Sequence, residues 1–391
     1  MESRLTARMA ETKYLEQAFC IELIDEATGR INVSCRRDSR KISGKWQLEI
    51  DGVRHSFGQF LISEMAAGAS REFLLSVEVP DMFYGSYARL IIRLSDENGN
   101  LVAEENFPMT PPAWLMPEKT AGEFFTGLRF DVSQAIISSG KLSAVIDASG
   151  MRELRINGEK LLNSGPRLAL FRAGMVPEKL RALKLDRIKI APDRFVSDGK
   201  SVECHALALP TLMEIDELEF TQRFTPQTDG TIRYDAEFVV PESFAGIPRL
   251  GVLFRLPGTM NEVTYLGIGP HENFPGDQGA VFSRYTALAD EFYPAYTPAI
   301  SGGSRSNTVK LILSDAAHTK TLQITGGREF TFSALPFSEF AIEDAGMAGK
   351  TPAAESEIFL HIDCRIGEKM PVKAGVYRMT FFLKAVSGKI R

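Results

Sequence analysis

The residues best suited to chemistry by type lie together in the second half of the chain. His271, Glu272 and Asn273 are consecutive and are flanked by glycines and prolines. A histidine beside a carboxylate can move protons as a general acid and base, and His361 and Asp363 have the same residue types. In the structural alternative, the glycines and prolines shape a tight loop whose backbone groups are satisfied by Glu272 and Asn273.

Aromatic residues and an arginine follow this stretch. Tyr293 and Tyr296 lie among prolines, and flat ring faces suit the C–H side of a sugar ring. Arg305 can pair with a carboxylate of the same loop. Clustered aromatic residues among prolines more often pack a loop, and a structural ion pair is the favoured role of Arg305. The predicted substrate-binding residues are therefore His271, Glu272, Asn273, Tyr293, Tyr296 and Arg305.

Familiar motifs of catalysis and cofactor binding are missing from the sequence. It contains no G-x-G-x-x-G after a strand, no G-x-x-x-x-G-K-[ST], no H-E-x-x-H and no G-x-S-x-G. The five histidines have no metal-ligand spacing, so we predict no metal site, no cofactor and no catalytic residue. Four cysteines without a C-x-x-C pair predict reduced thiols and a cytoplasmic protein.

Net charge and the distribution of apolar residues exclude several classes of binding partner. The formal net charge of -5 argues against nucleic acid or an anionic membrane surface as the main partner. No apolar run approaches the roughly 18–20 residues of a membrane span, and the N-terminus lacks the apolar region of a secretion signal. At roughly 100–200 residues per domain, 391 residues correspond to two or three domains.

Alternation of apolar and polar residues predicts an all-β chain. About seven alternating runs between residues 12 and 108 predict an immunoglobulin-like β-sandwich for residues 1–108. Prolines at 108, 111, 112 and 117 cannot continue a sheet, which places a linker at residues 109–120. Residues 121–391 then form a second domain.

Tight turns punctuate the second domain. Asn157-Gly158 and Asp229-Gly230 have the strongest hairpin signals, because these residue types tolerate positive φ. Asp198-Gly199 and Gly326-Gly327 are predicted as further turns, and Pro177–Leu185 is the best candidate for a short helix. About 270 residues of antiparallel strands fit a large two-sheet sandwich of about 14–18 strands.

Residues 265–315 carry a family resemblance. They read YLGIGPHENFPGDQGAVFSRYTALADEFYPAYTPAISGGSRSNTVKLILSD. This stretch resembles the C-terminal domain of family 2 β-galactosidases, whose pattern is G-x-G-P-x-E-N-[YF]-P-D followed by an Asp near Tyr-Pro and then a Gly-Arg. Residues 155–173, with RINGEKLLNSGP and then Phe-Arg-Ala, are similar to the entry into that domain. Tyr14–Gln17 and Val102–Phe107 resemble the ends of the preceding immunoglobulin-like domain.

The resemblance implies a galactose-mutarotase-like supersandwich after the immunoglobulin-like domain. It corresponds to the last two domains of a longer enzyme, or to the small subunit of two-subunit lactases. Both catalytic glutamates of that family lie in a (β/α)₈ barrel, which this chain has no room for. The resemblance therefore implies a carbohydrate-associated module that is non-catalytic on its own, with a large β-galactosidase subunit as partner and a galactoside-type sugar as ligand.

Several segments depart from the family pattern. The loop that brings a tryptophan to the active site is deleted between Ile358–Ile366 and Val376–Leu383, and the chain's tryptophans are Trp46 and Trp114. The Pro-x-Asp-Asn-Asp after Phe-Arg-Ala is replaced by Gly174–Glu178. The deleted loop motivates one alternative, a stand-alone carbohydrate-binding or structural protein. The fold that the resemblance implies motivates another, an aldose mutarotase or epimerase.

Overall fold

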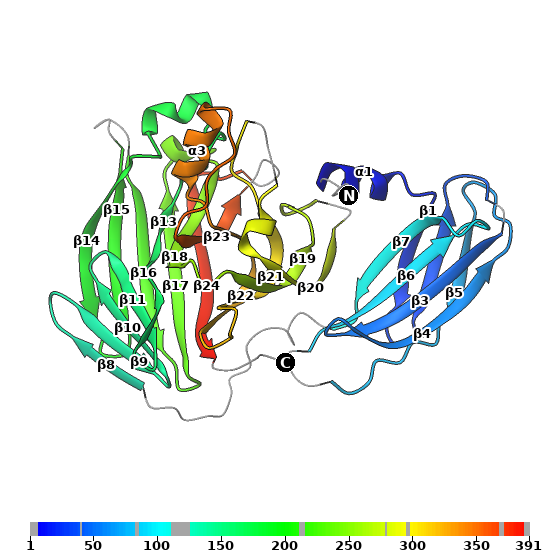
Figure 1. Cartoon of the computed structure of the whole chain (residues 1–391), viewed down its shortest axis with the longest axis horizontal. Coiled ribbons are helices and arrows are strands. Elements are labelled where there is room, and N and C mark those ends of the chain that lie inside the picture. Colours follow the sequence, from blue (N-terminus) through cyan, green and yellow to red (C-terminus); the bar gives the residue numbers. More distant parts are fainter. Residues whose placement is uncertain are drawn as a thin grey trace. The chain divides into compact units, whose positions relative to one another are not determined.

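The computed structural model describes residues 7–39, 41–82, 86–110, 126–210, 216–277, 280–294, 298–366 and 371–386. The chain divides into two compact units (Figure 1). The first comprises Met1–Glu118 with residues 268–270 and 277–284, and the second comprises the remainder. Residues 111–125 lie outside the described ranges, so the linker at 109–120 stays a prediction. Within the described ranges, no helix is long and apolar enough to cross a bilayer.

The first unit contains two small antiparallel sheets. One has the order β1-β2-β5 and the other β4-β3-β6-β7. Alternate residues of these strands face a core that includes Ile31, Leu48 and Ile92, all completely buried. The seven strands are β1 (Phe19–Asp25), β2 (Arg30–Cys35), β3 (Ile42–Ile50), β4 (Val53–Ile62), β5 (Ser70–Leu74), β6 (Ala88–Ser95) and β7 (Leu101–Pro108).

Helix α1 (Ala7–Leu15) precedes the first strand and was not predicted from the sequence. The Tyr14 hydroxyl, near its end, donates a hydrogen bond to the Glu105 carboxylate on β7 at 2.8 Å. Gln17 exchanges two hydrogen bonds with the backbone of Glu104. The two segments that carried the resemblance at the ends of this domain are therefore neighbours in the folded chain.

The second unit begins with a five-stranded meander. Its order is β12-β11-β10-β9-β8, so consecutive strands are neighbours. Asn157 and Gly158 both have positive φ, 49° and 87°, and connect β11 to β12 as a two-residue turn. The strands are β8 (Thr126–Phe130), β9 (Ala135–Ser139), β10 (Leu142–Asp147), β11 (Gly150–Ile156) and β12 (Glu159–Leu162).

The strands that follow the meander along the chain form a twelve-stranded sheet. Its main path is β13-β18-β23-β22-β24-β17-β16-β15-β14, and β21, β19 and β20 branch from β22. The pairings of described register are antiparallel, as predicted. Its strands are β13 (Ser164–Ala169), β14 (Lys189–Ser197), β15 (Val202–Leu209), β16 (Leu218–Pro226), β17 (Thr231–Val240), β18 (Arg249–Pro257), β19 (Glu262–Gly269), β20 (Val281–Leu288), β21 (Arg305–Ser314), β22 (Thr321–Leu335), β23 (Glu357–Ile366) and β24 (Gly375–Val386).

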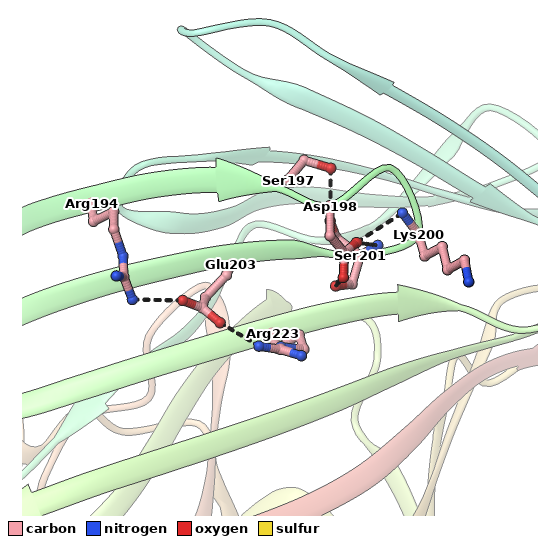
Figure 2. Close-up of polar contacts among 7 residues, drawn as sticks. All are labelled: Arg194, Ser197, Asp198, Lys200, Ser201, Glu203 and Arg223. Carbon is pink, nitrogen blue, oxygen red and sulfur yellow. Dashed lines mark hydrogen bonds and ion pairs between the residues drawn. The ribbon is translucent and has the colours of Figure 1, made fainter.

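Figure 2 shows a turn and two ion pairs that connect β14, β15 and β16. The Asp198 carboxylate accepts hydrogen bonds from the backbone N–H groups of Lys200 and Ser201, which closes the turn predicted at Asp198-Gly199. Glu203 on β15 bridges Arg194 on β14 and Arg223 on β16 at 2.8 and 2.6 Å. This side of the sheet is thus a solvated, charge-paired surface.

The prediction of a turn at Gly326-Gly327 is wrong. Both glycines lie inside β22, between the part that pairs with β24 and the part that pairs with β23. A Cβ on Gly326 would stand 2.1 Å from the Arg328 carbonyl oxygen. The glycines therefore permit a sharp irregularity within one long strand. Glycine inside a strand often marks such an irregularity rather than a turn between two strands.

Short helices complete the second unit. The predicted helix at Pro177–Leu185 is a 3₁₀ helix, η1 (Glu178–Leu183). Helix α3 (Glu339–Met347) was not predicted; its N-cap is Ser338, whose hydroxyl accepts a hydrogen bond from the Ala341 N–H. Two further 3₁₀ turns are η2 (Glu242–Phe244) and η3 (Ala289–Phe292). The prediction of an all-β chain with a small sandwich before a large one is confirmed.

Candidate functional site

Polar residues are buried on the face of the large sheet opposite its apolar core. On β18 and β23, the core face holds Leu250, Val252, Leu360 and Ile362, all completely buried. The alternate residues point the other way, and there Gly251 pairs with Asp363 and Leu253 pairs with His361. Both faces of these strands are therefore buried. One face packs in the apolar core, and the other carries charged and polar side chains.

Arg249 is the centre of this charged face. Its side chain is 0% exposed and contacts two carboxylates. The Nη1 atom lies 2.5 Å from Glu339 Oε1, and Nε lies 3.1 Å from Asp363 Oδ1. Burial opposes the charge of Arg249, yet the two carboxylates raise its pKa above the ordinary value. The arginine is thus permanently charged and holds both acids.

Asp363 is the more deeply buried of the two acids. It is 2% exposed, and burial raises its pKa to about 6 despite the opposing charges of Arg249 and Arg172. Gly251 leaves room for the Asp363 carboxylate. A Cβ at position 251 would stand 2.6 Å from Asp363 Oδ1 and 2.4 Å from the Ile362 carbonyl oxygen. A residue without a side chain therefore permits the ion pair with Arg249.

Glu339 comes from the first turn of α3 and lies over the same sheet face. Its carboxylate accepts hydrogen bonds from Arg249, from the Ser301 hydroxyl at 2.8 Å and from the Ala173 N–H at 2.8 Å. Three donors, one of them cationic, therefore fix the position of this carboxylate. Glu339 is therefore an anchored carboxylate that joins the helix, the sheet and the segment after β13.

His361 and Arg172 complete the cluster. His361 Nε2 lies 3.9 Å from Glu339 Oε1, and burial lowers the pKa of the ring well below its ordinary value, helped by Arg249 and Arg172. His361 is therefore neutral near pH 7. Arg172 donates to the Ser301 carbonyl oxygen at 3.4 Å, and burial lowers its pKa. We call Arg172, Arg249, Glu339, His361 and Asp363 the buried charge cluster.

The predicted His271–Asn273 motif lies in a loop whose contacts are well defined. Asn273 Oδ1 accepts from the N–H and hydroxyl of Ser306, at 2.8 and 2.6 Å, and its Nδ2 donates to the His271 carbonyl oxygen. Burial and the charge of Arg305 lower the pKa of His271. Glu272 acts electrostatically on Arg172, whose guanidinium carbon lies 5.0 Å from the centre of the Phe274 ring. The loop thus adjoins the buried charge cluster.

The remaining predicted residues contact protein groups. Arg305 is buried, donates to the Ser304 carbonyl oxygen at 3.0 Å and stacks over the Phe292 ring. The Tyr293 hydroxyl donates to the Ile300 carbonyl oxygen at 3.0 Å, and burial raises its pKa. Tyr296 lies outside the described residues. The assignment of these residues to sugar binding stays a prediction.

A cavity of about 410 Å³ opens beside the cluster. Glu339 and His361 line it, at 9% and 6% exposure. Its walls come from β13, β14, β18, β23, α3 and the segment between η1 and β14. The lining side chains are mostly apolar, and they are Leu168, Ala169, Leu170, Phe171, Leu185, Asp186, Ile188, Ile190, Leu253, Arg255, Ser338, Glu339, Phe340, Glu355, Phe359 and His361.

The sequence identified only part of this arrangement. His361 and Asp363 were candidates by residue type, and β23 places them on one face. Arg249 and Glu339 were missed. An arginine at the start of a mostly apolar strand and a glutamate after a helix-capping serine were visible signals. Among the described residues, no group of three or more His, Cys, Asp or Glu side chains could hold a metal ion.

Comparison with known families identifies the second unit. The family model described as beta galactosidase small chain matches residues 140–367, which is more than half of the chain. The chain belongs to the β-galactosidase small chain family. The matched region includes the whole buried charge cluster and the residues that line the cavity.

Relatives named β-galactosidase are much longer than the chain. It is 28% identical over 183 residues to a β-galactosidase of Vibrio cholerae, covering 43% of this chain and 17% of that protein. It is 24% identical over 339 residues to a β-galactosidase of Klebsiella pneumoniae, covering 78% of this chain and 32% of that protein. The chain therefore spans a third or less of these relatives.

Solved structures with similarity to the chain include two epimerases. One is a putative aldose 1-epimerase from Escherichia coli, with a TM-score of 0.37 and 8% identity, covering 68% of this chain and 100% of that one. The other is a galactose 1-epimerase from Lactobacillus acidophilus, with a TM-score of 0.34 and 11% identity, covering the same shares of the two chains.

Proposed function

We propose that this chain is the non-catalytic small-subunit module of a two-part β-galactosidase and assembles with a large subunit that carries the catalytic barrel. The match to the small chain family over residues 140–367 is the observation that carries the proposal. The share of the relatives' length that is covered, 17% and 32% in two cases, supports it, because most of such an enzyme lies elsewhere.

The buried acids of this unit are poorly suited to glycoside hydrolysis. A retaining glycosidase needs two carboxyl groups on either side of the bond that it cleaves, about 5–5.5 Å apart. Glu339 and Asp363 both contact one arginine, and Asp363 is not among the residues that line the cavity. That these two carboxylates share one arginine supports a structural role for them and hence the proposed non-catalytic module.

The alternative of an aldose mutarotase makes a different demand. It requires a general base and a general acid that face the anomeric oxygen of a hexose. His361 beside Glu339 has suitable residue types, but both carboxylate oxygens of Glu339 already accept hydrogen bonds from protein donors. We therefore propose that the module does not catalyse mutarotation, and polarimetry of freshly dissolved α-galactose distinguishes the two functions.

We propose that the module assembles into this enzyme in the cytoplasm. Support comes from the four cysteines, which are all free in the folded chain. In an oxidising compartment, free thiols are less common than disulfides.

Assembly is tested by mixing the full chain with a barrel-bearing large chain from the same genome. We expect one complex in gel filtration, with a light-scattering mass equal to a whole number of copies of both chains. Untagged chain in excess should displace a tagged copy from the complex, which controls for non-specific adsorption. Separate elution of the two chains at micromolar concentrations would contradict the proposal.

A further inference from the structure

We infer that two copies of the chain associate through β4 of the first unit, which pairs antiparallel with β4 of the second copy about a two-fold axis at Gln59. β4 is an edge strand, since its sheet has the order β4-β3-β6-β7 (Figure 1). Among the described residues it pairs with β3 alone. An edge strand presents a row of unpaired N–H and C=O groups that a further strand can take up. This association does not depend on the large chain proposed above.

The paired segment of β4 lacks the features that normally protect a sheet edge. Residues 56–62 read SFGQFLI and contain no charged residue and no proline. Charged side chains and prolines are the usual means of keeping edge strands apart. The other edge strands of the described sheets are β1, β5, β7, β8, β12, β13, β14 and β20. In these strands such residues leave uninterrupted stretches of at most four residues, the longest being YTAL in β20. β4 is therefore the exception.

Two large apolar side chains of this segment face solvent. Phe57 is 70% exposed and Leu61 is 64% exposed, and the exposed Gln59 lies between them. Alternate residues of a strand share a face, so these three lie on the sheet face opposite the completely buried Ile62. The irregularity in the pairing with β3 lies at His55, outside the segment. The segment is thus a regular strand with an apolar outer face.

The order of these side chains is self-complementary. In an antiparallel pair centred on Gln59, Phe57 of each copy lies directly opposite Leu61 of the other, and the two Gln59 amides face each other. Directly opposite side chains of antiparallel strands have Cβ atoms about 4.5–5.5 Å apart. Moving the axis to Gly58 or Phe60 would set Gln59 against Phe57 or Leu61 instead. Pairing of apolar with apolar side chains therefore selects the axis at Gln59.

The charges at the two ends of the segment are complementary as well. Arg54 precedes the segment and Glu64 follows it, and both are exposed. Antiparallel pairing brings the start of one copy to the end of the other, so Arg54 lies near Glu64 of the second copy. The Arg54 guanidinium carbon is 4.9 Å from the centre of the Phe57 ring, at the rim of the contact. Because both copies use the same strand, the contact closes as a dimer, and its confinement to one strand makes the dimer weak.

Sedimentation velocity of the full chain between about 5 and 500 µM tests the inference. We expect a reversible shift from monomer to dimer with a dissociation constant of about 10–100 µM. Gln59→Lys sets two like charges opposite each other at the axis and should weaken the dimer at least tenfold. Gln59→Glu should do the same, whereas an equimolar mixture of the two variants should dimerise at least as tightly as the wild type. Gln59 is exposed, so both variants should fold.

A second pair of variants controls for the loss of an exposed apolar side chain. Leu61→Lys should weaken the dimer at least tenfold. The matched control is Leu74→Lys, because Leu74 is 65% exposed and lies on the edge strand β5. This control should dimerise as the wild type does.

Four results would each overturn the inference. They are a monomer at every concentration, undiminished dimerisation of Gln59→Lys, no association in the mixture of the two Gln59 variants, and a dimer weakened equally by Leu74→Lys. Binding of the large chain is measured separately with the same variants. If Gln59→Lys lost that binding instead, the edge of β4 would belong to the large chain, which would contradict this inference and leave the proposed function standing.

Discussion

Replacing Asp363 with asparagine should change the pH dependence of stability in a defined direction. Burial raises the pKa of Asp363 from 3.8 to about 6 in the folded chain. The folded state therefore holds this proton more tightly than the unfolded state does. The contribution to stability is present below about pH 4 and is lost as pH rises through 6.

The magnitude follows from the pKa difference. A shift of about two units corresponds to roughly 3 kcal/mol at 1.36 kcal/mol per unit, and about 2 kcal/mol of it is lost between pH 4 and 7. Asp363→Asn has no proton to lose, so its free energy of unfolding should lack this component. The variant should gain about 2 kcal/mol relative to the wild type as pH rises from 4 to 7.

Urea unfolding at several pH values measures this difference. Far-UV circular dichroism follows both units. Emission of Trp46, on β3, follows the first unit when it is measured in chains that also carry Trp114→Phe. The pH-dependent difference should therefore appear in the circular dichroism transition of the second unit. A difference that is constant with pH, or a wild type that gains on the variant as pH rises, would refute the raised pKa and the burial that causes it.

Three further outcomes follow from the same contacts. Arg249→Met should lose about 3–5 kcal/mol because two buried carboxylates lose their partner, whereas Arg233→Met, an exposed arginine paired with Asp235, should lose less than about 1 kcal/mol; equal losses by urea unfolding would argue against a buried network. Gly251→Ala should separate β18 from β23, and hydrogen exchange of the β23 amides should rise; unchanged exchange would mean that the Ile362 carbonyl can move aside. Polarimetry should show no acceleration of α-galactose mutarotation, and an acceleration that is lost in His361→Phe would favour the epimerase alternative.

The sequence predicted elements where the signal is local. Alternating residues located the strands, and Asn157-Gly158 defined a turn because both residues have positive φ in the structure. Gly326-Gly327 gave the same local signal but lies within β22, because a glycine pair marks either a turn or a strand irregularity. Helix α3 is only nine residues long, too short for a clear helical period.

The candidate site was harder to predict because its residues come together through pairing of distant strands. Leu253 meets His361 only through the register of β18 and β23, and Glu339 reaches Arg249 from a separate helix. Residue type alone therefore found His361 and Asp363 but not their partners. The family resemblance, in contrast, rested on contiguous motifs, and the family match confirms it.

Hydrolysis of 4-nitrophenyl β-D-galactopyranoside by the purified full chain tests the central claim most directly. We expect release of nitrophenol at the rate of buffer alone, and rapid release once the barrel-bearing large chain is added. Turnover by this chain alone that persists through gel filtration, and that is lost in Glu339→Gln, would place a catalytic carboxylate in this chain and contradict the account.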